Sequence, residues 1–125
     1  MITKTSFAIL FLFICSNLFA QDCDRFRTGK FGMETHGVGM ITIERGADYE
    51  HIYPAGKIFE VHYSIKWISD CKYVETVTKV VNLKPEVKVG TRQYVEITKT
   101  YTDGYLCILT DEDGNKQTLR YFTIQ

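Results

Sequence analysis

Apolar and polar residues alternate along much of the chain with a period of two, which is typical of β-strands that are buried on one face. The clearest example spans residues 58–69. One face of that segment carries Phe59, Val61, Tyr63, Ile65 and Trp67, and the other carries Glu60, His62, Ser64 and Lys66. Thr, Val, Ile and Tyr are frequent throughout, and none of the windows shows the apolar stripe of an amphipathic helix. The pattern therefore predicts an all-β domain with this aromatic row facing the core.

Turn residues divide the rest of the chain into pieces of similar length. The strongest turn signal is Asp103-Gly104, because this pair supplies the positive φ that tight hairpins need. We expect eight strands, over residues 29–34, 38–44, 48–53, 58–69, 72–82, 92–101, 105–110 and 116–124. Short hairpins between them predict an antiparallel up-and-down meander. Closure into a barrel would remove the exposed edges, and an open, strongly curled sheet is the alternative.

The first twenty residues have the order of a secretory signal. Lys4 gives a positive start, residues 7–15 form an apolar helix-forming stretch, and the small residue Ala20 precedes Gln21. The alternative is a membrane anchor, but the apolar stretch is shorter than the ~20 residues of a spanning helix. We therefore expect a cleaved signal over residues 1–20, one domain over residues 21–125, and no membrane span after cleavage. The predicted location is periplasmic or extracellular.

Charge narrows the choice of partners. Cleavage would leave 14 Lys and Arg against 15 Asp and Glu, a net charge of −1. Nucleic-acid binding normally requires a basic surface, so we do not expect a nucleic-acid partner. The remaining chain of about 105 residues has the size of one domain.

Three cysteines remain after cleavage, Cys23, Cys71 and Cys107. In an oxidising compartment, two of them are expected to form a disulfide. In an up-and-down meander all three fall at the same end. Cys71 and Cys107 would lie on non-neighbouring strands, whereas bridged Cα atoms lie within ~7 Å. The arrangement predicts a Cys23–Cys71 bridge, with Cys107 as the alternative partner of Cys23.

The histidines offer the strongest candidate for catalytic chemistry. Glu60 and His62 share the polar face of one predicted strand, and Glu50 and His51 could lie across from them. A converging pair of histidines with a carboxylate could bind a metal or act in hydrolysis. The simpler interpretation is a solvated outer face, and we adopt it.

Other motifs fail on spacing. The acidic segment 111–115 resembles the start of a calcium loop, but Phe122 stands where an EF-hand has glutamate. Ser64 has no nucleophile elbow around it. We therefore predict no catalytic residue, no metal site, no cofactor and no enzymatic activity.

The aromatic residues bear on what fills the barrel. The chain has 8 Phe, 8 Tyr and 1 Trp, and several fall on predicted inner faces. An eight-stranded barrel is either filled by side chains or holds one small ligand. A cavity, if there is one, is predicted to be lined by Phe59, Tyr63, Trp67, Tyr73 and Tyr94. Because the strands are short, we expect the filled interior.

Four short motifs are shared with a group of bacterial proteins. They are Cys23-x-x-Phe26-Arg27-x-Gly29-x-Phe31, the Ile43 and Arg45 strand, Trp67-x-x-x-Cys71-x-Tyr73, and Tyr105-x-Cys107. With these motifs the chain resembles small exported proteins of flavobacteria and their relatives. The resemblance implies an extracytoplasmic bacterial setting and brings no activity with it. The Gly29-Lys30-Phe31 start also resembles the opening of lipocalin-like barrels, although lipocalins carry tryptophan where this chain has Phe31.

Three functions are compatible with these features. The first, which we favour, is a non-enzymatic exported binding or structural module. The second is a lipocalin-like carrier of a small apolar ligand. The third is a hydrolase or inhibitor domain that acts on an envelope component. A cavity of a few hundred Å³ would favour the carrier, and a cleft with a histidine and a perturbed carboxylate would favour the enzyme.

Overall fold

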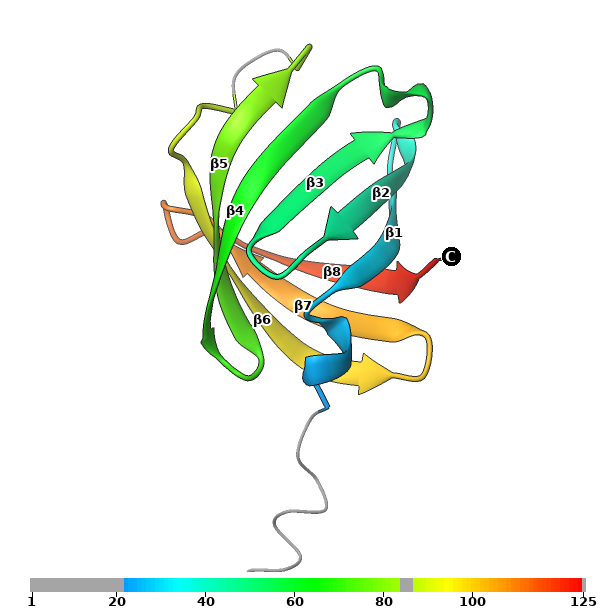
Figure 1. Cartoon of the computed structure of the whole chain (residues 1–125), viewed down its shortest axis with the longest axis vertical. Coiled ribbons are helices and arrows are strands. Elements are labelled where there is room, and N and C mark those ends of the chain that lie inside the picture. The colour runs from blue at the N-terminus through cyan, green and yellow to red at the C-terminus, as the bar shows by residue number, and fades with distance from the viewer. Residues whose placement is uncertain (1–21, 84–86, 125) are drawn as a thin grey trace, which may run out of the picture.

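The computed structural model describes residues 22–83 and 87–124, and within these ranges eight antiparallel strands form a closed barrel in sequence order (Figure 1). The strands are β1 (Gly29–Thr35), β2 (Gly39–Arg45), β3 (Tyr49–Pro54), β4 (Glu60–Ser69), β5 (Lys72–Val81), β6 (Arg92–Tyr101), β7 (Gly104–Thr110) and β8 (Lys116–Thr123). Two short 3₁₀ helices are η1 (Asp24–Phe26) before β1 and η2 (Ala55–Lys57) before β4. The predicted all-β up-and-down fold is confirmed, and it closes into a barrel. The predicted signal segment, residues 1–20, lies outside the described residues.

Burial follows the alternation that the sequence shows. In β4, Val61, Tyr63 and Ile65 are buried, while Ser64 and Lys66 between and beyond them are exposed. Such alternation allows one face of each strand to pack inside the barrel while the other meets solvent. None of the helices in the described ranges is long and apolar enough to cross a membrane.

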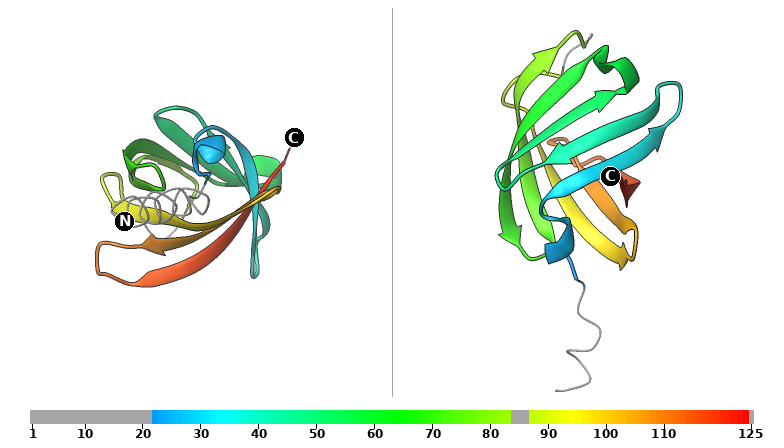
Figure 2. Two further views of the ribbon diagram at one scale, coloured as in Figure 1. Left: turned by 90° about the horizontal axis from the view of Figure 1, so that it is seen from below. Right: turned by 45° about the vertical axis from the view of Figure 1, so that its right-hand side comes forward.

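The barrel closes through a short seam between its first and last strands. β1 pairs with β2 from Gly29 to Thr35, whereas it pairs with β8 only around Gly32, which lies opposite Phe122. A Cβ atom on Gly32 would lie 2.7 Å from the Phe122 ring, so glycine allows this close approach. Beyond the seam the two strands run apart, β1 upward and β8 across the barrel (Figures 1 and 2). The strand edges are therefore separated above the seam.

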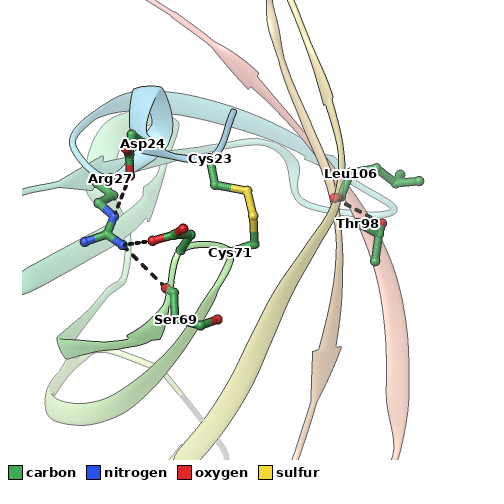
Figure 3. The surroundings of a disulfide bond; sticks show 8 residues. Cys23, Asp24, Arg27, Ser69, Cys71, Thr98 and Leu106 are labelled. Carbon is green, nitrogen blue, oxygen red and sulfur yellow. Dashed lines mark hydrogen bonds and ion pairs between the residues drawn. A yellow bond between two sulfur atoms is a disulfide. The ribbon is translucent and has the colours of Figure 1, made fainter. Parts of the chain in front are cut away.

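The end of the barrel at the bottom of Figure 1 is closed by η1 and a disulfide. Cys23 and Cys71 are bonded, with their Cα atoms 5.4 Å apart, as predicted (Figure 3). Beside the bridge, Arg27 pairs with Asp24 and reaches the Ser69 carbonyl (Figure 3). Cys107 is a buried free thiol. The disulfide indicates an oxidising, non-cytoplasmic setting.

This closed end is also where the main hydrophobic cluster lies. Phe26 of η1 packs against Phe31 and Tyr105, with ring centroids 6.2 and 5.1 Å away. The cluster continues through Ile43, Ile65, Tyr73, Val95, Ile97, Cys107 and Tyr121. A smaller cluster contains Val61, Tyr63 and Val77. One end of the interior is thus filled by side chains, but the expected filling of the whole interior is wrong, because a cavity of about 740 Å³ lies beyond this end.

Candidate functional site

A cavity of about 740 Å³ occupies the barrel interior beyond the filled end. All eight strands contribute to its lining. Lining residues, in strand order, include Met33, Ile43, Glu50, Ile52, Tyr63, Glu75, Gln93, Leu109, Leu119 and Tyr121. Pockets for small molecules typically measure ~300–1,000 Å³. The interior therefore has room for a ligand.

The cavity opens beside the seam. Consecutive residues of both separated strand edges border it, 33–36 at the end of β1 and 117–122 in β8. These segments include outward-facing positions such as Glu34 and Phe122. The lining thus extends from the inner face to the strand edges, and a ligand could enter between β1 and β8.

A buried ion pair adjoins the cavity at the part that we call its floor, and Glu50, the carboxylate of the pair, belongs to the lining. Arg45, the last residue of β2, has a side-chain exposure of 0%, and its partner Glu50 in β3 has 2%. The Nε and Nη2 atoms of Arg45 each lie 2.8 Å from Glu50 Oε1. Nη1 donates to the Phe26 carbonyl at 2.8 Å, and Nη2 donates to the hydroxyls of Tyr73 and Tyr105 at 3.0 and 2.7 Å. Each guanidinium nitrogen thus has a hydrogen-bond partner, which a buried cation needs.

Aromatic rings surround the same guanidinium. Its carbon lies 4.8 Å from the centroid of the Phe31 ring and 5.0 Å from that of Tyr73. Burial by itself would lower the pKa of Arg45, but Tyr105, Tyr73 and Glu50 together raise it well above its ordinary value. Arg45 is therefore a fixed positive charge that joins η1, β3, β5 and β7.

Glu75 of β5 is the second carboxyl group of the floor. The residue is 2% exposed, and its Oε1 atom accepts a hydrogen bond from Gln93 Nε2. Burial raises the pKa of Glu75 well above its ordinary value, and the negative charge of Glu50 raises it further, so the protonated form is favoured. With Glu75 protonated, Arg45, Glu50 and Glu75 together carry no net charge.

One atom of this floor lacks a partner. Among the described residues, none forms a hydrogen bond with Glu75 Oε2, although the atom is buried. Unpaired buried polar atoms are costly, and each one in a native structure calls for an explanation, such as strain, a catalytic role or a bound water or ion. This atom belongs to a side chain that lines the cavity.

The predicted cavity residues are placed differently from one another. Tyr63 lines the 740 Å³ cavity. Phe59 and Trp67 are partly buried against the main hydrophobic cluster, in which Tyr73 is fully buried and packs on Trp67 at 4.6 Å. Tyr94 is 43% exposed on the outer face, and together with Tyr73 it borders a separate pocket of about 280 Å³ over β5, β6 and β7. Of these five residues, Trp67 and Tyr73 therefore belong to the filled end and Tyr63 belongs to the cavity, whose other lining residues are mainly aliphatic and polar.

The histidine pair forms on the outer face. His51 lies opposite His62, and their rings stack with centroids 3.8 Å apart. Burial lowers the pKa of His62, and the charge of His51 lowers it further, while Glu60, 3.8 Å away, opposes both effects. Glu50 is not part of this group, because it alternates with His51 and points inward. Across residues 22–83 and 87–124, groups of three or more His, Cys, Asp or Glu that could hold a metal are not found.

Sequence reasoning overlooked the charged floor, although the alternation contained the signal. Arg45 follows Ile41 and Ile43 on the same face of β2, and Glu75 stands between Tyr73 and Val77 on the inner face of β5. Charged residues in register with core residues are either buried or at the end of a strand. The alternation thus identifies Arg45 and Glu75 as charged residues on inner faces, but it does not show which side chains they contact.

Comparison of the chain with family models, with curated proteins and with solved structures gives no match. The function is therefore inferred from the chemistry of the cavity itself.

Proposed function

We propose that the protein is an exported, non-enzymatic binding protein that holds a small, partly apolar molecule inside its barrel. The observation that carries this proposal is the cavity of about 740 Å³ to which every strand contributes. Apolar side chains such as Ile43, Ile52 and Leu109 line it together with polar ones, among them Glu50, Glu75 and Gln93. Apolar walls with a small number of oriented polar groups are typical of small-molecule sites.

The arrangement supports binding more than hydrolysis. The stacked pair His51 and His62 lies outside the barrel, on the far side of β3 and β4 from the cavity. The carboxyl groups inside are held by Arg45 and Gln93 rather than by a histidine. A lipocalin-like carrier, the second function considered from the sequence, is therefore the form of binding module that the cavity favours.

Export is part of the same proposal. The signal-like order of residues 1–20 and the resemblance to exported flavobacterial proteins both favour a periplasmic or extracellular location. The Cys23–Cys71 bridge is in keeping with an oxidising compartment. The ligand would then be a molecule met outside the cytoplasm, free or released from the envelope.

A titration with an apolar fluorescent probe, N-phenyl-1-naphthylamine, tests the proposal. Leu109→Trp places an indole in the cavity, whereas Ile108→Trp, one residue earlier, places it on the outer face of β7. We expect the wild type and Ile108→Trp to bind the probe and Leu109→Trp to bind it at least about tenfold more weakly. Equal binding by all three proteins, or no binding by the wild type, would overturn the proposal. Circular dichroism of each variant shows whether it has folded.

A further inference from the structure

We propose that Glu75 binds the head group of the ligand and that this head group is a basic amine. The inference rests on the proposed function, because it assumes that the cavity is a binding site. It concerns the one atom of the floor that the described side chains leave without a hydrogen-bond partner, Glu75 Oε2. That atom belongs to a carboxyl group that lines the cavity together with apolar and polar side chains.

Charge favours a cation at this position. Among the described residues, the buried charged side chains are two carboxyl groups, Glu50 and Glu75, and one cation, Arg45. Arg120, which also borders the cavity, is partly exposed and pairs with Asp103. Arg45 already pairs with Glu50 at 2.8 Å. An ammonium group next to Glu75 would supply the second cation and leave the four charges balanced. It would also supply the N–H donor that Oε2 lacks.

The same floor disfavours anions. A carboxylate head group, such as that of a fatty acid, would be brought close to the Glu50 carboxylate, and like charges in a buried site repel strongly. Arg45 cannot compensate, because its nitrogen atoms are engaged by Glu50, Phe26, Tyr73 and Tyr105. The hydrocarbon part of an amphipathic amine would lie against the aliphatic walls formed by Ile43, Ile52, Leu109 and Leu119.

Binding of an ammonium ion to a protonated Glu75 releases a proton. The ion R–NH₃⁺ keeps its proton, Glu75 loses its own to solvent, and the product is an ammonium–carboxylate ion pair. Other titratable groups around Glu75 are Arg45 on β2, Glu50 on β3, Tyr63 on β4, Tyr73 on β5, Cys107 on β7 and Tyr121 on β8. Burial raises the pKa of the three tyrosines and of Cys107, and Arg45 stays charged. The released proton therefore comes from the Glu50–Glu75 pair.

Isothermal titration calorimetry with octylamine, octan-1-ol and octanoate tests the inference, because the three probes share one alkyl chain. For the wild type at neutral pH, we expect octylamine to bind about tenfold or more tightly than octan-1-ol, and octanoate to bind most weakly. Titrations in buffers of different ionisation enthalpy should show release of a proton with octylamine and none with octan-1-ol. Glu75→Gln keeps the size of the side chain and should lose both the preference and the proton release. Glu96→Gln, which removes a carboxylate of the outer face that pairs with Lys72, is the control and should behave as the wild type does.

The outcomes separate the two proposals. Equal affinity for the three probes, tighter binding of octanoate, or a Glu75→Gln variant that keeps the preference for octylamine would overturn the amine inference and leave the binding function standing. Octan-1-ol should still bind Glu75→Gln, which shows that this variant has kept its cavity. A wild type that binds none of the probes would overturn both.

Discussion

Arg45 and Glu50 lie opposite each other on β2 and β3 and form an ion pair at 2.8 Å inside the barrel, with side-chain exposures of 0% and 2%. Two charges at such depth are stable only because the hydroxyls of Tyr73 and Tyr105 and the Phe26 carbonyl satisfy the remaining donors of Arg45. The pair thereby couples the closed end of the barrel to the floor of the cavity.

Removal of Arg45 alone should be severe. Arg45→Met leaves the Glu50 carboxylate buried without its cation, and we expect the free energy of unfolding to fall by about 3–5 kcal/mol. The double variant Arg45→Met/Glu50→Gln should recover a large part of that loss, because no unpaired charge remains. Urea unfolding of the three variants measures both effects. A single variant within about 1 kcal/mol of the wild type would contradict the role given to the pair.

Stability should depend on pH through Glu75. Its pKa in the folded protein is raised above the ordinary value of 4.5, so the folded state holds a proton that the unfolded chain releases. The contribution is complete below about pH 4.5 and is lost as pH rises through the higher folded pKa, at up to about 1.4 kcal/mol per pH unit. Urea unfolding of Glu75→Gln over a pH series should lack this loss, while Glu96→Gln should follow the wild type. Parallel curves for Glu75→Gln and the wild type would show that Glu75 is ionised in the folded protein.

The cysteines should differ sharply in chemistry. The Cys23–Cys71 bridge closes a loop with a sequence separation of 48, and its loss in Cys23→Ser/Cys71→Ser should lower the free energy of unfolding by about 4 kcal/mol in the chain-entropy picture.

Burial raises the pKa of the Cys107 thiol to about 12. Cys107 should therefore resist iodoacetamide at pH 8 in the native protein and react once the protein is unfolded. Peptide mapping under non-reducing conditions should recover Cys23 linked to Cys71, and a bridge to Cys107 would contradict the structure.

A variant of Trp67 distinguishes residues that stabilise the filled end from residues that contact the ligand. Its ring packs on Tyr73 with the centroids 4.6 Å apart, and the Arg27 guanidinium lies over it, 4.7 Å from the ring centroid. Among the described residues that line the cavity, Trp67 is not found. Trp67→Ala should lower the free energy of unfolding by about 3 kcal/mol. Affinity for octan-1-ol, measured well below the unfolding temperature, should stay within about twofold of the wild type. A large loss of affinity with little loss of stability would mean that the indole borders the ligand.

The sequence supported the fold more strongly than the site. Alternation in segments such as residues 58–69, with turns such as Asp103-Gly104, was sufficient to predict the strand order and the end at which Cys23 and Cys71 meet. Alternation shows which face a residue occupies but not its height in the barrel, because the height depends on strand tilt and on irregularities such as the register shift between His62 and Tyr63. Tyr73 was therefore expected at a cavity, and it lies under the floor instead.

Binding inside the barrel is best tested by methyl-resolved NMR during a titration with octan-1-ol, a small amphipathic molecule that carries no charge. Ile43, Ile52, Leu109 and Leu119 line the cavity, Ile65 and Ile97 lie in the filled end, and Ile68 and Ile108 border the outer pocket. We predict saturable shifts for the methyl groups of the first set and nearly none for the other two. Shifts confined to the outer set, or no saturable shift at all, would contradict a ligand-binding cavity inside the barrel.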